Sequence, residues 1–379
     1  MKKTIYLIAM MMMGLISFTS CSSDRDSNPE LKQPEEFKMN IPALAGNTYD
    51  LANSDYVAFS CSQPDYGYTA PVTYAVQLSL TEDMDNAQVL PTVFNTVNIQ
   101  ADAKEMSVAV TQLLVDDGHA EADFPMETPV YVRLHAQLAE GVGEVLSNVV
   151  KLESVKTAFS LPPVLLPENV YMIGNFCGWN WDNSFTMVGV NGANDTFWHM
   201  VYIDSEKADG KGIKISTTQA WDGHDYGFGK LEIEDKAEAG VEGNDGNIVV
   251  SKAGWYLAVV TAQVEGRDVK FKLTLQKPEV YTMGPVSGGW DECNPAALFT
   301  VPETKDGQFV SPAFVEGVNG DPGVRAYIKI APYDWWKTEF MVFDGEIKYR
   351  GRGGDQDRVS AEAGQKLYLD FNNETGEIK

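Results

Sequence analysis

The sequence predicts an all-β protein made of tandem β-sandwich domains. Along residues 38–158, runs in which apolar and polar residues alternate are separated by clusters of Gly, Asn, Asp and Pro. Short apolar runs bounded by similar turns continue through residues 168–379, where no amphipathic helix longer than about two turns is expected. Residues 168–379 also contain an internal duplication. Together these observations predict a first sandwich domain followed by two copies of a second one.

Composition narrows the classes of partner. The chain has 379 residues, enough for two or three domains that each bury a core, and 44% of them are hydrophobic. The formal net charge of −25 would repel nucleic acid and anionic lipid. A neutral ligand remains compatible with this charge.

The first 21 residues have the pattern of an export signal. Lys2 and Lys3 precede an apolar run from Ile5 to Phe18, which is too short to span a membrane, and a small-residue site ends in Cys21. The pattern resembles a bacterial lipoprotein signal, which implies that Cys21 becomes the lipidated N-terminus. Phe18 departs from the usual Leu, and an ordinary secretory signal is the alternative. The acidic, Pro-containing residues 22–37 are expected to form a disordered tether, similar to the surface-export signal of Bacteroidetes lipoproteins.

Residues 38–158 are expected to form a domain with immunoglobulin-like strand spacing. Its clearest strand has Val72, Tyr74, Val76, Leu78 and Leu80 on one face. It contains neither tryptophan nor a glycine-rich loop, so we assign it a spacer role. Beyond Cys21, the three cysteines fall one in each predicted domain, which excludes a disulfide within a domain and leaves no metal-ligand spacing. We predict no metal and no cofactor.

The duplication rests on three anchors in the same order. Val170 to Trp179 matches Val280 to Trp290, and Lys214 to Trp221 matches Lys329 to Trp336, with a tryptophan seven residues after the lysine in both. A third match begins at Val250 and Val359. The offsets of 110, 115 and about 110 residues suit a duplicated domain rather than a solenoid. We place the two copies at residues 168–277 (module 1) and 279–379 (module 2).

All eight tryptophans lie in the duplicated region. Trp198 and Trp255 sit in strand-like runs and are expected in the core. The other six follow or lie among turn residues, where a large flat side chain is costly to expose without a partner. These loop tryptophans are Trp179, Trp181, Trp221, Trp290, Trp335 and Trp336.

The stretch from Val170 to Asn180 resembles the strand-and-turn signature of starch-binding modules. Together with the export signal, the acidic tether, the tryptophan-free domain and the two tandem modules, it makes the whole chain similar to the SusE/SusF group of outer-membrane lipoproteins of Bacteroidetes. Two modules rather than three resemble the SusE type. The resemblance implies a non-catalytic protein that binds starch or a related α-glucan on the extracellular face of the outer membrane. It also implies partners, namely a TonB-dependent transporter complex and its glycan-binding lipoproteins.

Carried over by position, the resemblance implies one binding site in each module. In module 2, Trp290 would pair with Trp336, or with Trp335 as its rival, and the hydrogen-bond donors would be Arg325, Lys329 and Arg350. In module 1, Trp179 or Trp181 would act with Trp221 and Lys214, and Tyr226 is a further stacking candidate. The arginines have no clear counterpart in module 1, so equal affinity of the two sites is not expected. The alternative is that Trp179 and Trp290 only pack over their own turns.

Four functions are alternatives to starch binding. A glycosidase needs two carboxylates that face one bond, one of them with a raised pKa, whereas the acids here cluster in turns, so we predict no catalysis. Calcium binding would need an alternating-acid spacing that these loops lack. An adhesin or scaffold whose tryptophans contact protein stays open. So does a polysaccharide other than starch, because aromatic platforms also bind β-glucans.

Overall fold

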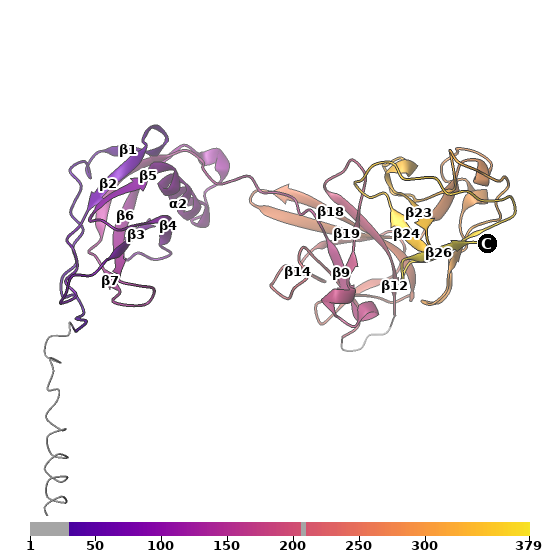
Figure 1. The fold of residues 1–379 in the computed structure, drawn as a ribbon, viewed down its shortest axis with the longest axis horizontal. Helices are drawn as coiled ribbons and strands as arrows, with labels where there is room; N and C mark the ends of the chain where they lie inside the picture. The colour runs from indigo at the N-terminus through magenta and orange to yellow at the C-terminus, as the bar shows by residue number, and fades with distance from the viewer. Residues whose placement is uncertain (1–29, 206–209) are drawn as a thin grey trace, which may run out of the picture. The chain divides into compact units, whose positions relative to one another are not determined.

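The computed structural model describes residues 30–205 and 210–379, and it divides into two compact units between Pro163 and Val164 (Figure 1). The expected leader, Cys21 and residues 22–29 of the tether lie outside the described residues. The last part of the expected tether packs on the first unit, because the Lys32 amide donates to Tyr66 O (3.0 Å) and Phe37 is 5% exposed. Within the described ranges, no helix is long and apolar enough to cross a membrane.

From residue 30 onward, the first unit consists of two β-sheets and one α-helix. The predicted alternating strand 72–80 is present as β3 (Thr73–Ser79), which pairs antiparallel with β6 (Met126–Gln137) in the centre of the larger sheet. That sheet has the order β1 (Thr48–Asp50), β8 (Val150–Thr157), β6 (Met126–Gln137), β3 (Thr73–Ser79) and β4 (Gln88–Phe94), with β7 (Val145–Leu146) paired to β6. The smaller sheet pairs β2 (Tyr56–Ser60) with β5 (Asn98–Asp102).

The helix α2 (Ala103–Asp116) departs from the expectation that the first domain contains strands alone. Asp102 ends β5 and caps the helix, since its carboxylate accepts the amides of Lys104 and Glu105. Met106, Val110 and Leu113 then recur at helical spacing and are buried. This helix packs within the otherwise all-β unit.

The second unit contains both modules, and the all-β prediction holds for its described residues. In module 1 one sheet has the order β10 (Phe185–Thr186), β9 (Tyr171–Gly174), β13 (Ile213–Ser216), β17 (Asn247–Val250) and β16 (Val241–Asn244), with β14 (Asp225–Tyr226) paired to β13. The other has the order β11 (Val188–Gly189), β12 (Thr196–Ile203), β18 (Gly254–Glu265), β19 (Asp268–Gln276) and β15 (Glu232–Asp235). Module 2 has one seven-stranded sheet of order β20 (Val280–Met283), β22 (Arg325–Ile328), β23 (Glu339–Phe343), β24 (Glu346–Tyr349), β26 (Thr375–Ile378), β25 (Leu367–Asp370) and β21 (Phe309–Val310).

The two modules share a hydrophobic core. One face of β12, including Phe197 and Val201, packs inside module 1, and the opposite face carries Trp198 and Met200 into the apolar cluster of module 2. Because both faces are covered, the strand is apolar along nearly its whole length. The predicted burial of Trp198 and Trp255 is confirmed, at 0% and 4% exposure.

Arg352 of module 2 joins the modules with polar contacts. Its guanidinium donates to the carbonyl oxygens of Glu168 (2.9 Å), Ala193 (3.1 Å) and Asn194 (3.1 Å), and it lies 4.5 Å from the centre of the Phe197 ring. The tandem modules are therefore packed on each other rather than strung on a free linker.

Candidate functional site

Each module brings two loop tryptophans together at a similar tilt. The ring centres of Trp179 and Trp221 are 6.1 Å apart with 41° between their planes, and those of Trp290 and Trp335 are 5.7 Å apart, also at 41°. Trp221 and Trp290 are 54% and 51% exposed. We call these two pairs the tryptophan platforms. In module 2 the partner of Trp290 is thus Trp335, the rival candidate, rather than Trp336.

The first member of each platform is held by the turn that follows the first strand of its module. After β9 and after β20 the chain forms a 3-10 turn and then a left-handed glycine, Gly178 (φ 64°) or Gly288 (φ 82°). The Trp290 ring rests on Gly284, where an added Cβ would meet it at 3.3 Å. Trp290 therefore packs over its own turn and still leaves half of its surface exposed, so these two properties are not alternatives.

Strand register shows which residues of the two modules are equivalent. Tyr171 lies opposite Ser216, and its repeat partner Tyr281 lies opposite Tyr327. Two residues before each of those positions stand Lys214 and Arg325. The structural counterpart of Lys214 is therefore Arg325 and not Lys329, so the seven-residue spacing from lysine to tryptophan does not mark equivalent lysines.

A carboxylate completes the arrangement in both modules. Ser216 pairs with Asp225 at the start of β14, as Tyr327 pairs with Glu339 at the start of β23. Lys214 Nζ donates to Asp225 (2.8 Å), and Arg325 Nη1 donates to Glu339 (2.7 Å). Neither acid was identified from the sequence, although each is the first residue of the strand that follows a tryptophan loop.

The same two cations lie against the second tryptophan of each platform. Lys214 Nζ is 5.7 Å from the ring centre of Trp221, and the Arg325 guanidinium is 5.6 Å from that of Trp335. Each module thus repeats one unit, in which a carboxylate holds a cation and the cation faces a platform tryptophan. We call this unit the acid–cation–tryptophan unit.

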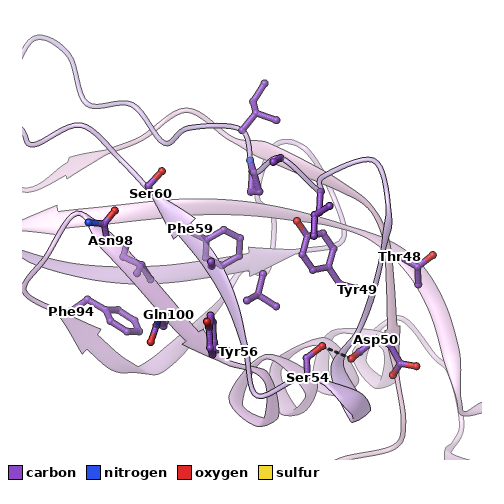
Figure 2. Close-up of a pocket in the computed structure, with 17 residues that line it drawn as sticks. Thr48, Tyr49, Asp50, Ser54, Tyr56, Phe59, Ser60, Phe94, Asn98 and Gln100 are labelled. Atoms are coloured by element: carbon purple, nitrogen blue, oxygen red, sulfur yellow. Dashed lines mark hydrogen bonds between the residues drawn. The ribbon is translucent and has the colours of Figure 1, made fainter.

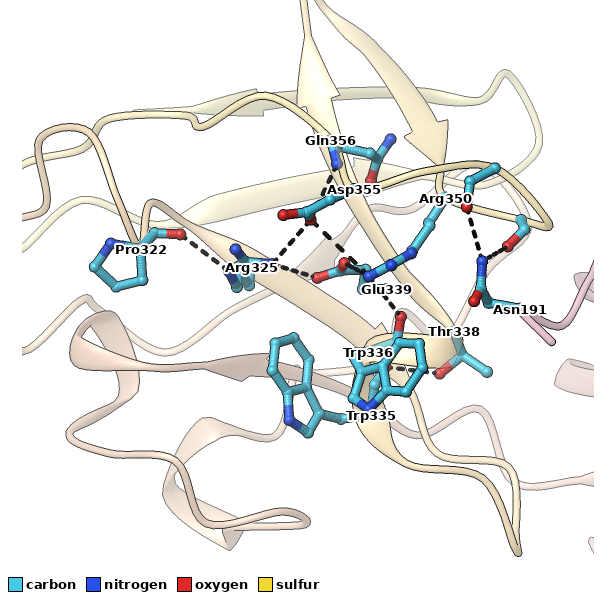
Figure 3. Close-up of polar contacts among 12 residues, drawn as sticks. Asn191, Pro322, Arg325, Trp335, Trp336, Thr338, Glu339, Arg350, Asp355 and Gln356 are labelled. Carbon is cyan, nitrogen blue, oxygen red and sulfur yellow. Dashed lines mark hydrogen bonds and ion pairs between the residues drawn. The ribbon is translucent and has the colours of Figure 1, made fainter.

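Module 2 adds a second arginine to its unit. Arg350 Nη1 donates to the other oxygen of Glu339 (2.7 Å), and its guanidinium lies 5.0 Å from the ring centre of Trp336 (Figure 3). The side chains of Arg325 and Arg350 are only 8% and 14% exposed, and that of Glu339 is fully buried. The two arginines predicted to serve as ligand donors are thus largely engaged with Glu339.

Lys329 connects the two tryptophan loops of module 2 through Glu292. Lys329 Nζ donates to Glu292 Oε2 and to Tyr333 O (3.0 Å), while Glu292 Oε1 accepts the Trp335 amide (3.0 Å). Burial alone would raise the pKa of Glu292, but the Lys329 hydrogen bond and charge together with the Trp335 amide bring it below its ordinary value. Glu292 is therefore ionised at neutral pH and fixes the Trp335 loop.

Trp181 and Tyr226 of module 1 take different positions. The Trp181 ring centre is 4.8 Å from that of Trp221 at 56°, and its buried indole N–H has no partner among the described residues. Trp181 therefore supports Trp221 from the side. Tyr226 contacts Phe271 in the module core (ring centres 4.7 Å apart) and, as the residue after Asp225, lies on the other face of β14.

A recess of about 990 Å³ lies in the first unit, between the loop that carries Ile41 and strands β2 and β5 (Figure 2). Tyr49, Tyr56, Phe59 and Phe94 line it, and Asp50 is the only carboxylate in its lining. It has no tryptophan and no basic residue. It therefore lacks the chemistry that the two platforms share.

Comparison with known proteins gives consistent matches. Residues 169–272 and 279–377 match the family model described as SusF/SusE starch-specific carbohydrate-binding modules, and residues 23–134 match the model described as SusE outer membrane protein. Outer membrane protein SusF of Bacteroides thetaiotaomicron is 37% identical over 254 residues, which cover 64% of this chain and 50% of that protein. The chain therefore matches about half the length of this relative. The crystal structure of SusF from Bacteroides thetaiotaomicron aligns with 91% of this chain and all of that chain, at 23% identity and a TM-score of 0.45.

Proposed function

Because this chain belongs to the SusF/SusE family of starch-specific carbohydrate-binding modules, we propose that it is a non-catalytic, starch-binding protein of the outer membrane. Each tryptophan platform would hold one stretch of α-glucan. The observation that carries this proposal is the repetition of the tilted tryptophan pair in both modules, at 41° in each. Two copies of the same exposed geometry in diverged loops indicate a shared ligand.

The shape and chemistry of the platforms suit a curved glucan. The faces of sugar rings carry C–H groups that pack on flat aromatic side chains, and a tryptophan can bury roughly 150–250 Å² in such contact. Two rings set at an angle follow the curvature of an α-glucan helix better than a flat strip would. Lys214, which lies beside the Trp221 ring and is 20% exposed, can offer N–H groups to hydroxyls without any charge on the ligand, whereas Arg325 and Arg350 are engaged with Glu339.

The state of the carboxylates beside the platforms supports binding rather than hydrolysis. A glycosidase needs a carboxyl whose pKa is raised so that it can donate a proton. The hydrogen bond from Lys214 instead holds the pKa of Asp225 below its ordinary value, and Glu339 is shared by two arginines. Both acids are committed to structural ion pairs.

We further place the protein on the extracellular face, anchored through a lipid on Cys21 and associated with a TonB-dependent transporter complex and its glycan-binding lipoproteins. The family match to an outer membrane protein over residues 23–134 and the lipoprotein-like leader support this placement. Two weak sites on one chain would gain affinity for a long polymer through effective concentration. The chain would thus retain starch near the membrane for uptake.

Affinity electrophoresis tests the proposal. The chain from Ser22 onward is run in native gels that contain amylose, pullulan or a β-glucan, beside the double variant Trp221→Ala/Trp335→Ala. Tyr56→Ala, which removes a half-exposed aromatic from the first unit, is the matched control. We expect the α-glucans to retard the parent and the control but not the double variant.

Other outcomes would contradict this function. Retardation by the β-glucan alone would indicate a different polysaccharide. Migration unaffected by every glucan, with all proteins folded, would leave a protein ligand and thus the adhesin or scaffold function.

A further inference from the structure

We propose that Asp225 and Glu339 are positioning residues of the two binding sites: each carboxylate fixes the cation that holds its platform tryptophan, so that the platform has its binding geometry before the glycan arrives. This inference rests on the proposed glycan-binding function and assigns these sites a component that lies behind the platform. Neither residue needs to touch the ligand.

Burial is the first part of the argument. The side chain of Glu339 is fully buried and that of Asp225 is 12% exposed. Burying a carboxylate costs free energy unless it is ion-paired and hydrogen-bonded. A buried acid in a sheet is therefore expected to have a cation beside it. Both oxygens of Glu339 are occupied, one by Arg325 and one by Arg350.

The geometry around the cations is the second part. Lysine and arginine side chains are flexible, and a surface cation moves among many rotamers. Arg325 is instead held at three points, because Nη1 donates to Glu339 (2.7 Å), Nε donates to Pro322 O (3.0 Å) and the guanidinium faces Trp335. Figure 3 shows Glu339 between the two arginines, with Trp335 and Trp336 next to them. An immobilised cation restricts the ring against which it packs.

The duplication is the third part and is independent of the other two. The pair is Asp with Lys in module 1 and Glu with Arg in module 2, and the acid follows its cation by 11 residues in one and by 14 in the other. Despite these differences, the cation lies at a nearly equal distance from its tryptophan, 5.7 Å and 5.6 Å. A pair needed only for sheet stability would not have to keep this third contact.

Preorganisation predicts a measurable loss of affinity. A platform whose tryptophan must be ordered on binding loses the affinity equivalent of one immobilised side chain, about two- to tenfold. Asp225→Asn is measured in a Trp335→Ala background, so that module 1 alone binds, and Glu339→Gln in a Trp221→Ala background, so that module 2 alone binds. The amide variants keep the side-chain shape and remove the charge. Calorimetry with a soluble α-1,4-glucan oligosaccharide gives the affinities.

The controls separate positioning from general stability. Glu232→Gln in β15 of module 1 and Glu346→Gln in β24 of module 2 remove exposed acids that contact neither platform and should leave affinity unchanged. The double substitution Lys214→Arg/Asp225→Glu puts the module 2 ion pair into module 1. It should bind more tightly than Asp225→Asn and close to the parent. Near-ultraviolet circular dichroism of the ligand-free protein reports how its aromatic side chains are held, the tilted tryptophans among them, and we expect its signal to weaken in Asp225→Asn and Glu339→Gln.

Each result supports or overturns the inference. Folded variants that keep both the parental affinity and the parental dichroism would overturn it, as would a loss of affinity with unchanged dichroism, since the acid would then contact the ligand itself. Asp225 is less deeply buried than Glu339. If Glu339→Gln does not fold, the affinity and dichroism of Asp225→Asn therefore test the inference. Should the parent bind no α-glucan, the proposed function fails, while the dichroism still reveals whether the acids fix the tryptophans.

Discussion

The two modules reach the same platform geometry with ion pairs of different depth. In module 1 the side chains of Lys214 and Asp225 are 20% and 12% exposed, whereas in module 2 those of Arg325 and Glu339 are 8% and 0% exposed. Arg350 adds a second cation on Glu339 alone. The tilt of the rings is therefore the same in both copies, although the charges behind them are more deeply buried in module 2. Module 2 should accordingly tolerate loss of its acid less well than module 1.

The largest expected effect on stability comes from the hydrophobic core that the two modules share. Trp198 is fully buried and, although it belongs to module 1, packs against Phe340 and Tyr349 of module 2. We expect Trp198→Ala to lower the free energy of unfolding of the second unit by about 3–5 kcal/mol, because it leaves a large cavity. Urea unfolding followed by far-ultraviolet circular dichroism measures this loss. The exposed Trp221→Ala should change stability little, and an equally small effect of Trp198→Ala would mean that the modules unfold independently.

Removal of Glu339 should destabilise the protein more than removal of Asp225, because Glu339 is more deeply buried. Glu339→Ala leaves two arginines without their buried partner and should cost about 3–5 kcal/mol of stability, whereas Asp225→Ala leaves one partly exposed lysine and should cost about 1–3 kcal/mol. Denaturant unfolding of the two variants under the same conditions gives both numbers. Equal losses would show that the second cation, Arg350, adds nothing.

The adjacent tryptophans of module 2 should differ in their effect on binding. Trp335 faces Trp290, whereas Trp336 lies between Arg350 and Lys337. In a Trp221→Ala background, Trp335→Ala should weaken α-glucan binding by at least about 2 kcal/mol, or roughly thirtyfold, which takes a weak site below detection, and Trp336→Ala should weaken it less. Calorimetry compares the two variants. A larger loss for Trp336→Ala would restore the pairing that the sequence suggested.

Low pH should weaken the ion pairs that Asp355 makes with Arg325, Arg350 and Arg358 in module 2. The hydrogen bond from Arg358, followed by its charge and that of Arg325, lowers the pKa of Asp355 from 3.8 to about 2. Because the folded value is depressed, the stabilisation is present above about pH 4 and is lost as pH falls from about 4 to about 2. The side chain is half exposed, so solvent screening keeps the effect small.

Urea titrations between pH 5 and pH 2 test this dependence. Asp355→Asn should lose less stability over this range than the parent. Identical pH profiles would mean that the Asp355 ion pairs do not contribute.

Much of the strand pattern and the main aromatic residues could be predicted from sequence. The alternation at Tyr74 and Val76 forms β3, and the six loop tryptophans include both platforms. The signals for α2 were also present, since Asp102 precedes residues at helical spacing, but a strand that ends at the same aspartate concealed them. The alternation of apolar residues therefore predicted the strands correctly, but it did not show that the domain also contains a helix.

The partners of the tryptophans could not be predicted, because they depend on register and loop length. The neighbours Trp335 and Trp336 lie in a 3-10 turn that sends one ring toward Trp290 and the other toward Arg350. Lys214 and Lys329 share a spacing to tryptophan, yet strand pairing aligns Lys214 with Arg325. Sequence spacing therefore identified which residue types matter, and only the sheet showed which of them are equivalent.

Binding stoichiometry tests most directly the central claim that each module carries one platform. Calorimetry with an α-1,4-glucan oligosaccharide too short to reach both sites should give two sites per chain for the parent, one for Trp221→Ala and one for Trp335→Ala. The combined variant should bind none. A single site in the parent, or two sites that persist in either single variant, would contradict the claim.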